Sequence, residues 1–188
     1  MDETQQWFVD ASAALGAKVH AVGSGQWTHD TPCTEWDVRA LVSHVVYENL
    51  WIPDLLAGKT VAEVGDRYEG DQLGDDPIAV WDRASEAAVA AVSADGAMTA
   101  TTHLSYGDVP GADYVREVFT DLAVHGWDLA RAIGVDDTID PAWAQSIYDE
   151  LAPKEAELKA SGLWGDTIVP PPDADIQTKL LAVMGRVQ

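Results

Sequence analysis

The sequence predicts an all-α protein: a four-helix bundle with one long crossover connection and small additions at the C-terminus. Apolar residues recur at spacings of three and four over most of the chain, and Gly, Pro and capping residues separate the segments with this spacing. The length of 188 residues suits one domain of ordinary size. We therefore expect a single domain over residues 1–188, with a bundle core at about 4–160 and a C-terminal extension at about 161–188.

The first expected helix covers residues 4–22 and ends at Gly23. Its apolar positions lie on one helix face. They are Phe8, Ala11, Leu15 and Val19. The second helix is expected from Thr34 to about Ala57, with Thr34 as its N-cap and Asp37 closing a capping box. Pro53 should kink or split it, because proline has no amide hydrogen and its ring clashes one turn back.

In the middle of the chain, the sequence predicts a connecting segment, a helix and an extended segment. Residues 58–75 are rich in Gly and Asp and predict a long connection with at most a short turn. Asp76 then supplies an N-cap for a helix over 77–92. Residues 98–106 favour a short strand or an extended crossover, and 107–111 a turn.

The last expected bundle helix covers residues 112–133 and is closed by Gly134. A fifth helix is expected over about 141–158. A break at three prolines, 170–172, precedes a short amphipathic helix over about 174–184.

Charge and composition exclude several classes of function. The chain has 11 basic and 32 acidic residues, a net charge of −21, which argues against a nucleic-acid or anionic-membrane surface. The start has no signal-peptide pattern, and no segment is apolar enough to span a membrane. We expect a soluble cytoplasmic protein with no nucleic-acid or membrane partner, whose exposed helix faces would allow a homodimer.

The expected helix 112–133 carries the most informative pattern, a stripe of residues at alternating spacings of four and three. The stripe consists of Tyr114, Val118, Asp121, His125, Asp128 and Ala132. His125 also belongs to the neighbouring apolar seam, so it lies at the border of the core. Polar groups there are costly unless something pairs with them. A metal ion is such a partner, because it binds imidazole nitrogen and carboxylate oxygen together.

The second expected helix offers a matching stripe, in which His44 and Glu48 are four residues apart among apolar residues. Two helices that each present a His and an acid toward one interior are typical of bundle metal sites. Spacing alone leaves the alternative open, because an acid and a His four apart occur often by chance and a helix His is more commonly a hydrogen-bonded residue than a ligand.

Two runs resemble a known family. The run TPCTEWDVRALVSHVVYEN is similar to the helix-entry motif of the mycothiol-dependent maleylpyruvate isomerase metal-binding domain, in the DinB-like superfamily, and GDVPGADYVREVFTDLAVHGWDLARAIG resembles its second metal motif. The closing PDADIQTKLLAVMGR resembles the end of a single-domain actinobacterial branch. The resemblance implies a DinB-like bundle whose metal ligands are His44, Asp121 and His125. Asp121 stands where many relatives have Glu or His, which shortens its reach by one methylene.

The resemblance also implies a chemistry. Three protein ligands leave a coordination position open, as in catalytic rather than structural sites. The expected ion is divalent, zinc first, with nickel or another ion as alternatives, and the expected co-substrate is a low-molecular-weight thiol such as mycothiol. Glu48 and Asp128 are the candidate catalytic residues, orienting ligands or moving a proton, unless they are simply solvated helix acids.

The isomerase that names the family has a further C-terminal domain, for which this chain is too short. We therefore expect a metal- and thiol-dependent transferase or isomerase that acts on a small electrophile, rather than maleylpyruvate isomerisation itself. The alternatives are a non-enzymatic metal- or small-ligand-binding bundle involved in stress handling, and a structural helical dimer without ligands. Cys33, with no visible activating partner, is expected to have a packing role, and Trp36 is expected in the second helix with its side chain in the protein core.

Overall fold

The computed structural model describes residues 1–155 and 168–187. Within these ranges the regular secondary structure is helical apart from one two-stranded sheet, which confirms the predicted all-α fold class. The chain separates into two compact units, Met1–Val135 and Asp136–Gln188, called here the N-terminal and C-terminal units. No helix among the described residues is long and apolar enough to cross a membrane.

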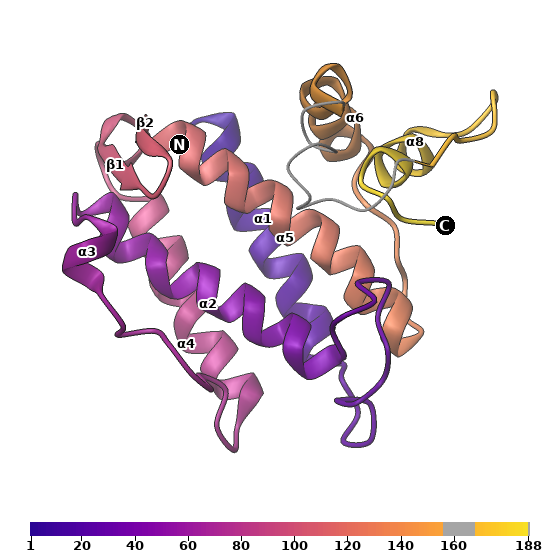
Figure 1. The fold of residues 1–188 in the computed structure, drawn as a ribbon, viewed down its shortest axis with the longest axis horizontal. Helices are drawn as coiled ribbons and strands as arrows, with labels where there is room; N and C mark the ends of the chain where they lie inside the picture. The colour runs from indigo at the N-terminus through magenta and orange to yellow at the C-terminus, as the bar shows by residue number, and fades with distance from the viewer. Residues whose placement is uncertain (156–167, 188) are drawn as a thin grey trace. The chain divides into compact units, whose positions relative to one another are not determined.

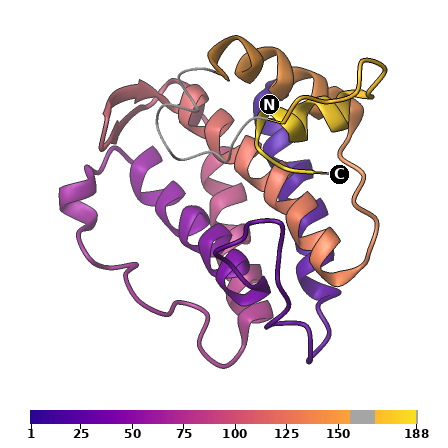
Figure 2. The same cartoon turned by 45° about the vertical axis from the view of Figure 1, so that its right-hand side comes forward.

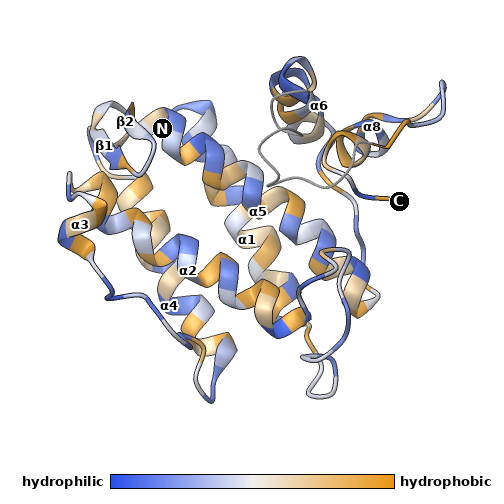
Figure 3. Ribbon diagram, viewed as in Figure 1, coloured by the Kyte–Doolittle hydropathy of each residue, from blue (hydrophilic) through white to orange (hydrophobic). Residues whose placement is uncertain are grey.

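The N-terminal unit is the four-helix bundle. Its helices are α1 (Glu3–His20), α2 (Val38–Leu56), α4 (Pro77–Val92) and α5 (Gly111–Ile133). Helix α1 packs against α5 and α4, and α2 packs against α4 and α5. Figures 1 and 2 both show α1 beside α5. Apolar and polar residues alternate around α2 and α5 in Figure 3, as expected for helices with one face in a core.

Three of these helices lie where the sequence predicts them. Every residue of the predicted apolar face of α1 is buried: Phe8, Ala11, Leu15 and Val19. Helix α4 has Asp76 as its N-cap and begins at a proline, as expected. Helix α5 ends at Gly134, which adopts the left-handed conformation that glycine permits at a helix C-terminus.

Helix α2 begins later than predicted. Its N-cap is Asp37, whose side chain accepts a hydrogen bond from the Ala40 amide at 2.8 Å, so the predicted capping box at Thr34 is wrong. The physical reason lies upstream, where the Thr31 hydroxyl donates to the carbonyl of Trp36 at 2.8 Å. This bond folds residues 31–37 into a loop and leaves Trp36 outside the helix where it was expected.

Pro53 does not split α2, which continues through it to Leu56. Proline removes one amide donor and crowds the carbonyl four residues earlier. Pro53 lies in the last turn of the helix, so only the residues just before the C-terminus are affected.

The crossover from α2 to α4 contains the four-residue helix α3 (Val61–Val64), in agreement with the predicted short turn. Residues on both sides of α3 are tied to α2 by the buried carboxylate of Asp54. Asp54 accepts hydrogen bonds from Lys59 Nζ at 2.6 Å and the Tyr68 hydroxyl at 2.9 Å, and it also pairs with Arg67.

The segment between α4 and α5 holds the 3-10 turn η1 (Ala97–Thr99) and a hairpin of β1 (Thr101–Leu104) and β2 (Gly107–Pro110). The predicted strand is therefore present, but the predicted turn over 107–111 is wrong, because residues 107–110 form the second strand. The strands are antiparallel, with Thr102 opposite Val109. The Thr102 hydroxyl donates to the Val109 carbonyl at 2.9 Å and reinforces this pairing.

The C-terminal unit contains α6 (Pro141–Leu151), η2 (Ala152–Lys154) and α8 (Ile176–Val183), with α6 packed against α8. The predicted helix over 174–184 is present as α8. The predicted end of the fifth helix near Leu158 lies outside the described residues, as does the predicted boundary at 160–161. The single domain over residues 1–188 stays a prediction.

Candidate metal centre

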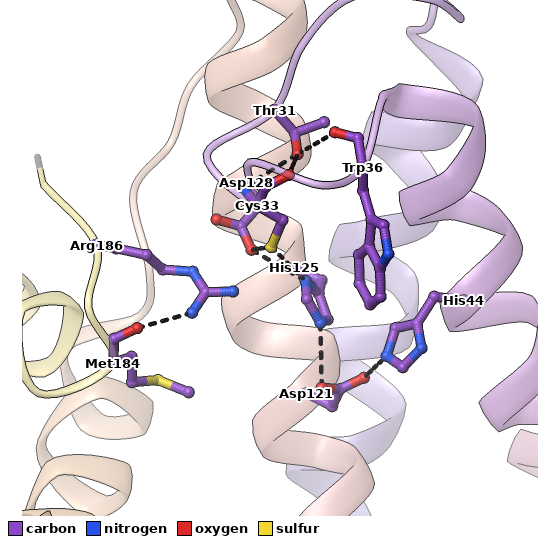
Figure 4. A network of polar contacts seen from close by, with 9 residues as sticks. All are labelled: Thr31, Cys33, Trp36, His44, Asp121, His125, Asp128, Met184 and Arg186. Carbon is purple, nitrogen blue, oxygen red and sulfur yellow. Dashed lines mark hydrogen bonds and ion pairs between the residues drawn. The ribbon is translucent and has the colours of Figure 1, made fainter. Parts of the chain in front are cut away.

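Helices α2 and α5 bring three of the predicted site residues together (Figure 4). His44 Nε2 lies 2.9 Å from Asp121 Oδ2, and His125 Nε2 lies 3.2 Å from Asp121 Oδ1. One donor atom from each residue lies within 4.8 Å of the other two. Residues 77 positions apart in the chain thus converge on one carboxylate, each imidazole facing a different oxygen.

The spacing on α5 explains part of this geometry. Asp121 and His125 are four residues apart, so their side chains lie on the same face of the helix, which packs against α2. The side chains of His44 and Asp121 are 25% and 32% exposed, whereas that of His125 is 8% exposed. The cluster is therefore anchored in the core at His125 and open to solvent at its other two members.

The imidazole of His125 and the carboxylate of Asp121 each shift the pKa of the other group in the direction that favours its charged form. Burial alone would lower the pKa of His125, but the adjacent Asp121 charge and hydrogen bonds raise it well above the usual range. For Asp121, burial acts to raise the pKa, and the two imidazoles overcome this effect and hold it well below its usual range. Without a metal ion, these shifts favour the protonated form of His125 and the charged form of the Asp121 carboxylate.

Glu48 lies half-buried on α2, one turn after His44. Burial raises the pKa of its carboxyl group, and the negative charge of Asp121 raises it further. The charge of His44 opposes this shift. Glu48 is thus within electrostatic reach of the cluster, although it is not among the residues whose donor atoms converge there.

Asp128 is fully buried on α5, behind the His125 ring. Its Oδ2 lies 3.0 Å from His125 Nδ1. A hydrogen bond from Nδ1 to this carboxylate leaves Nε2 directed at Asp121 and fixes the ring orientation. Carboxylates hold metal-binding histidines in many proteins in this way.

Cys33, expected to have only a packing role, also contacts this site. Its thiol donates to Asp128 Oδ2 at 3.2 Å, and its Sγ lies 3.9 Å from His125 Nδ1. Cys33, for which the sequence shows no activating partner, therefore has two polar neighbours in the fold. The partners lie 92 and 95 residues later in the chain, so no local spacing reveals them.

Trp36, on the same loop, covers the two histidines. Its ring centroid lies 4.6 Å from that of His44 and 5.5 Å from that of His125. The loop of residues 31–37 thus supplies an aromatic wall on one side of the cluster and a thiol on the other side of the His125 ring (Figure 4).

The donor set fits a divalent transition-metal ion. Two imidazole nitrogens and one carboxylate oxygen are the ligands of many catalytic zinc sites, which keep a further position open. Asp121 holds both its oxygens toward the imidazoles although it is one methylene shorter than glutamate, because α2 and α5 pack directly against each other.

Comparison with known proteins identifies a family that the chain matches. The family model described as "Mycothiol maleylpyruvate isomerase N-terminal domain" matches residues 8–130, a stretch that includes His44, Asp121 and His125. The chain is 36% identical over 135 residues to the uncharacterized proteins MT0763 and Rv0738 from two strains of Mycobacterium tuberculosis. Each alignment covers 72% of this chain and 68% of the relative. No solved structure matches the chain significantly.

Proposed function

Because the chain belongs to the mycothiol maleylpyruvate isomerase N-terminal domain family, we propose that it binds one divalent metal ion through His44, Asp121 and His125 and uses it in thiol chemistry. The reaction we propose is a thiol-dependent transfer or isomerisation of a small electrophile. The co-substrate is a low-molecular-weight thiol such as mycothiol, the thiol in the family's name.

One observation carries this proposal. The Asp121 carboxylate faces an imidazole nitrogen with each of its oxygens, at 2.9 and 3.2 Å, from two different helices. Zinc fits this mixed nitrogen and oxygen set, and nickel is the first alternative. An ion held there supplies an open position at which a thiol loses its proton and becomes a nucleophile near neutral pH.

Two acidic residues have roles in this proposal. Asp128 holds the His125 ring through Nδ1 and so acts as a positioning residue. Glu48 accepts the proton that an arriving thiol releases, because burial favours the protonated form of its carboxyl group.

Tyr114 adds a donor on the same face of α5. Its hydroxyl is buried and has no hydrogen-bond partner among the described residues. Burial raises its pKa, and the charge of Glu48 raises it further, so the hydroxyl keeps its proton. Since an unpaired buried hydroxyl is costly, we assign it to hydrogen bonding with bound substrate or water.

The alternative is a non-enzymatic bundle that binds a metal or small ligand in stress handling. The observation in its favour is that the matched model describes only the N-terminal domain of the isomerase.

Activity with a thiol and an electrophile separates these two functions. We expect conjugation by the intact chain to be lost on chelation, restored by zinc and absent in His125→Ala. His20→Ala serves as the matched control, because His20 forms an exposed imidazole–carboxylate pair with Asp82 at 2.8 Å. Conjugation that survives both chelation and His125→Ala would eliminate the catalytic proposal. Metal binding without any turnover would favour the alternative.

A further inference from the structure

Behind His125 lies a second set of donors, made of a thiol, an imidazole nitrogen and a carboxylate oxygen. We propose that Cys33 Sγ, His125 Nδ1 and Asp128 Oδ2 form a second metal site, for a thiophilic divalent ion such as Cd²⁺, Co²⁺ or Zn²⁺. The site goes beyond the proposed function and shares His125 with it.

The distances between these donors suit one small ion. Cys33 Sγ lies 3.2 Å from Asp128 Oδ2 and 3.9 Å from His125 Nδ1, and 3.0 Å separates Nδ1 from Oδ2. Donors at the corners of a tetrahedral zinc site lie about 3.3–3.6 Å apart, given the usual zinc–sulfur, zinc–nitrogen and zinc–oxygen bond lengths. The observed triangle matches one face of such a tetrahedron to within a few tenths of an ångström.

The donors are also held in place before any ion arrives. Asp128 is fully buried, and His125 is nearly so. On the loop, the Thr31 hydroxyl oxygen accepts from the Cys33 amide at 3.1 Å, while the hydroxyl donates to the Trp36 carbonyl at 2.8 Å. Cys33 is half-buried, which leaves an approach for an ion. Ligands on fixed elements lose little conformational freedom when they bind.

The shared imidazole makes the two sites alternatives for a single ion. A neutral imidazole has one nitrogen free to bind a metal, while the other carries a proton. With an ion on Nε2, Nδ1–H donates to Asp128; with an ion on Nδ1, Nε2–H donates to Asp121, 3.2 Å away. Each arrangement thus has its hydrogen-bond acceptor already in place.

Cobalt titration of the intact chain tests this site, since Cys33 is the only cysteine in the sequence and any thiolate-to-metal absorption must come from it. In His44→Ala/Asp121→Asn, which disables the first site, we expect one Co²⁺ per chain and a near-ultraviolet thiolate charge-transfer band. Adding Cys33→Ser should abolish this band. The matched control His20→Ala/Asp82→Asn should behave as the unaltered chain.

Absence of the band in a folded His44→Ala/Asp121→Asn variant would overturn the second site. If that variant loses its helical circular dichroism signal, the rate of alkylation of Cys33 in the unaltered chain tests the second site instead. Excess Cd²⁺ should slow the alkylation. An unchanged rate would contradict the site. The proposed function fails separately, when Cys33→Ser binds no Co²⁺ although its fold is intact.

Discussion

The carboxylate of Asp128 decides how the His125 ring presents its nitrogens. It accepts from Nδ1 at 3.0 Å inside the core, and the same oxygen also accepts from the Cys33 thiol. This hydrogen bond fixes the orientation of the His125 ring, so that Nε2 faces Asp121 in a single rotamer. The affinity of the site at His44, Asp121 and His125 therefore depends on a residue that is not one of its three ligands.

Asp128→Asn tests this dependence. The amide can still fill the space, but it is uncharged and holds the Nδ1–H less strongly, so we expect zinc affinity to fall about 10- to 100-fold. Competition against a chromophoric chelator measures the change. The control is Asp82→Asn, which alters the exposed carboxylate beside His20 and should leave affinity unchanged.

Acid should release the metal. Burial acts to lower the pKa of His125, but the Asp121 charge raises it well above the usual value, which favours the protonated form of metal-free His125. An arriving ion must displace this proton, so affinity falls as pH falls and rises as pH rises. Calorimetry in two buffers of different ionisation enthalpy should show about one proton released per ion. Equal apparent heats in the two buffers would contradict this prediction.

At the scale of elements, the start of α5 requires that the backbone of Gly111 lie close to the backbone of residues 97–100. The Gly111 amide donates to the Ala100 carbonyl at 2.7 Å, and a Cβ at this position would collide with the backbone carbonyl of Ala97. A clash with backbone cannot be relieved by a change of rotamer. Gly111 thus joins the hairpin segment to the helix that supplies two of the three proposed ligands.

Gly111→Ala should destabilise the bundle by about 1–3 kcal/mol or more. Chemical denaturation measures this loss. Gly126→Ala is the matched control in the same helix, because its Cβ would meet only the flexible end of Lys18, at 3.6 Å. That variant should be neutral or stabilised by about 0.5–1 kcal/mol, as alanine favours helix. Equal losses in both variants would show that the close approach has no special role.

Asp54 stabilises the crossover between α2 and α4, and this contribution to stability should depend on pH. A hydrogen bond from Lys59 lowers the pKa of Asp54 below 3.8 in the folded chain. Its contribution is therefore present above pH 3.8 and is lost as the pH falls through the folded-state pKa. Asp54→Asn should lower the free energy of unfolding at pH 7 by about 1–3 kcal/mol. Thermal unfolding of the variant at pH 7 and pH 3 should show a smaller difference than in the unaltered chain.

The sequence predicts those elements whose signals are local. Asp76 and Gly134 each mark a helix end with their own side chain or backbone, and both predictions are confirmed. The start of α2 depends instead on a hydrogen bond from Thr31, which makes Asp37 rather than Thr34 the N-cap. The second strand was missed because its pairing with β1 over a two-residue turn leaves no apolar alternation in the sequence.

The same distinction holds at the site. Asp121 and His125 are four residues apart, so helical spacing alone puts them side by side. His44 joins them only through the packing of α2 on α5, which the matching stripe on the second helix suggested and the family resemblance implied. Cys33 lies on an irregular loop and contacts a residue 95 positions later in the chain, so its contact with Asp128 could not be predicted.

At the scale of the whole molecule, all residues of the proposed sites belong to the N-terminal unit, Met1–Val135. The four bundle helices and the family match over residues 8–130 lie in the same unit. The negative charges that give the net charge of −21 do not all have the same surroundings, because Asp121 and Asp128 lie beside the buried His125.

A fragment of residues 1–135 should therefore fold and bind metal by itself. We expect one cooperative unfolding transition and a zinc affinity within about threefold of that of the full chain, since its ligands come only from α2 and α5. Circular dichroism and zinc competition measure the two properties. A folded fragment that does not bind zinc would show that residues beyond 135 are needed for the site.

The central claim is that His44, Asp121 and His125 hold a divalent ion, and metal analysis after equilibrium dialysis tests it most directly. The chain, stripped with chelator and dialysed against micromolar zinc, should retain one ion. His125→Ala should retain none, because His125 contributes to both donor sets, whereas His20→Ala should retain one. A folded chain that retains no zinc, or a His125→Ala variant that retains as much as the unaltered chain, would contradict the claim.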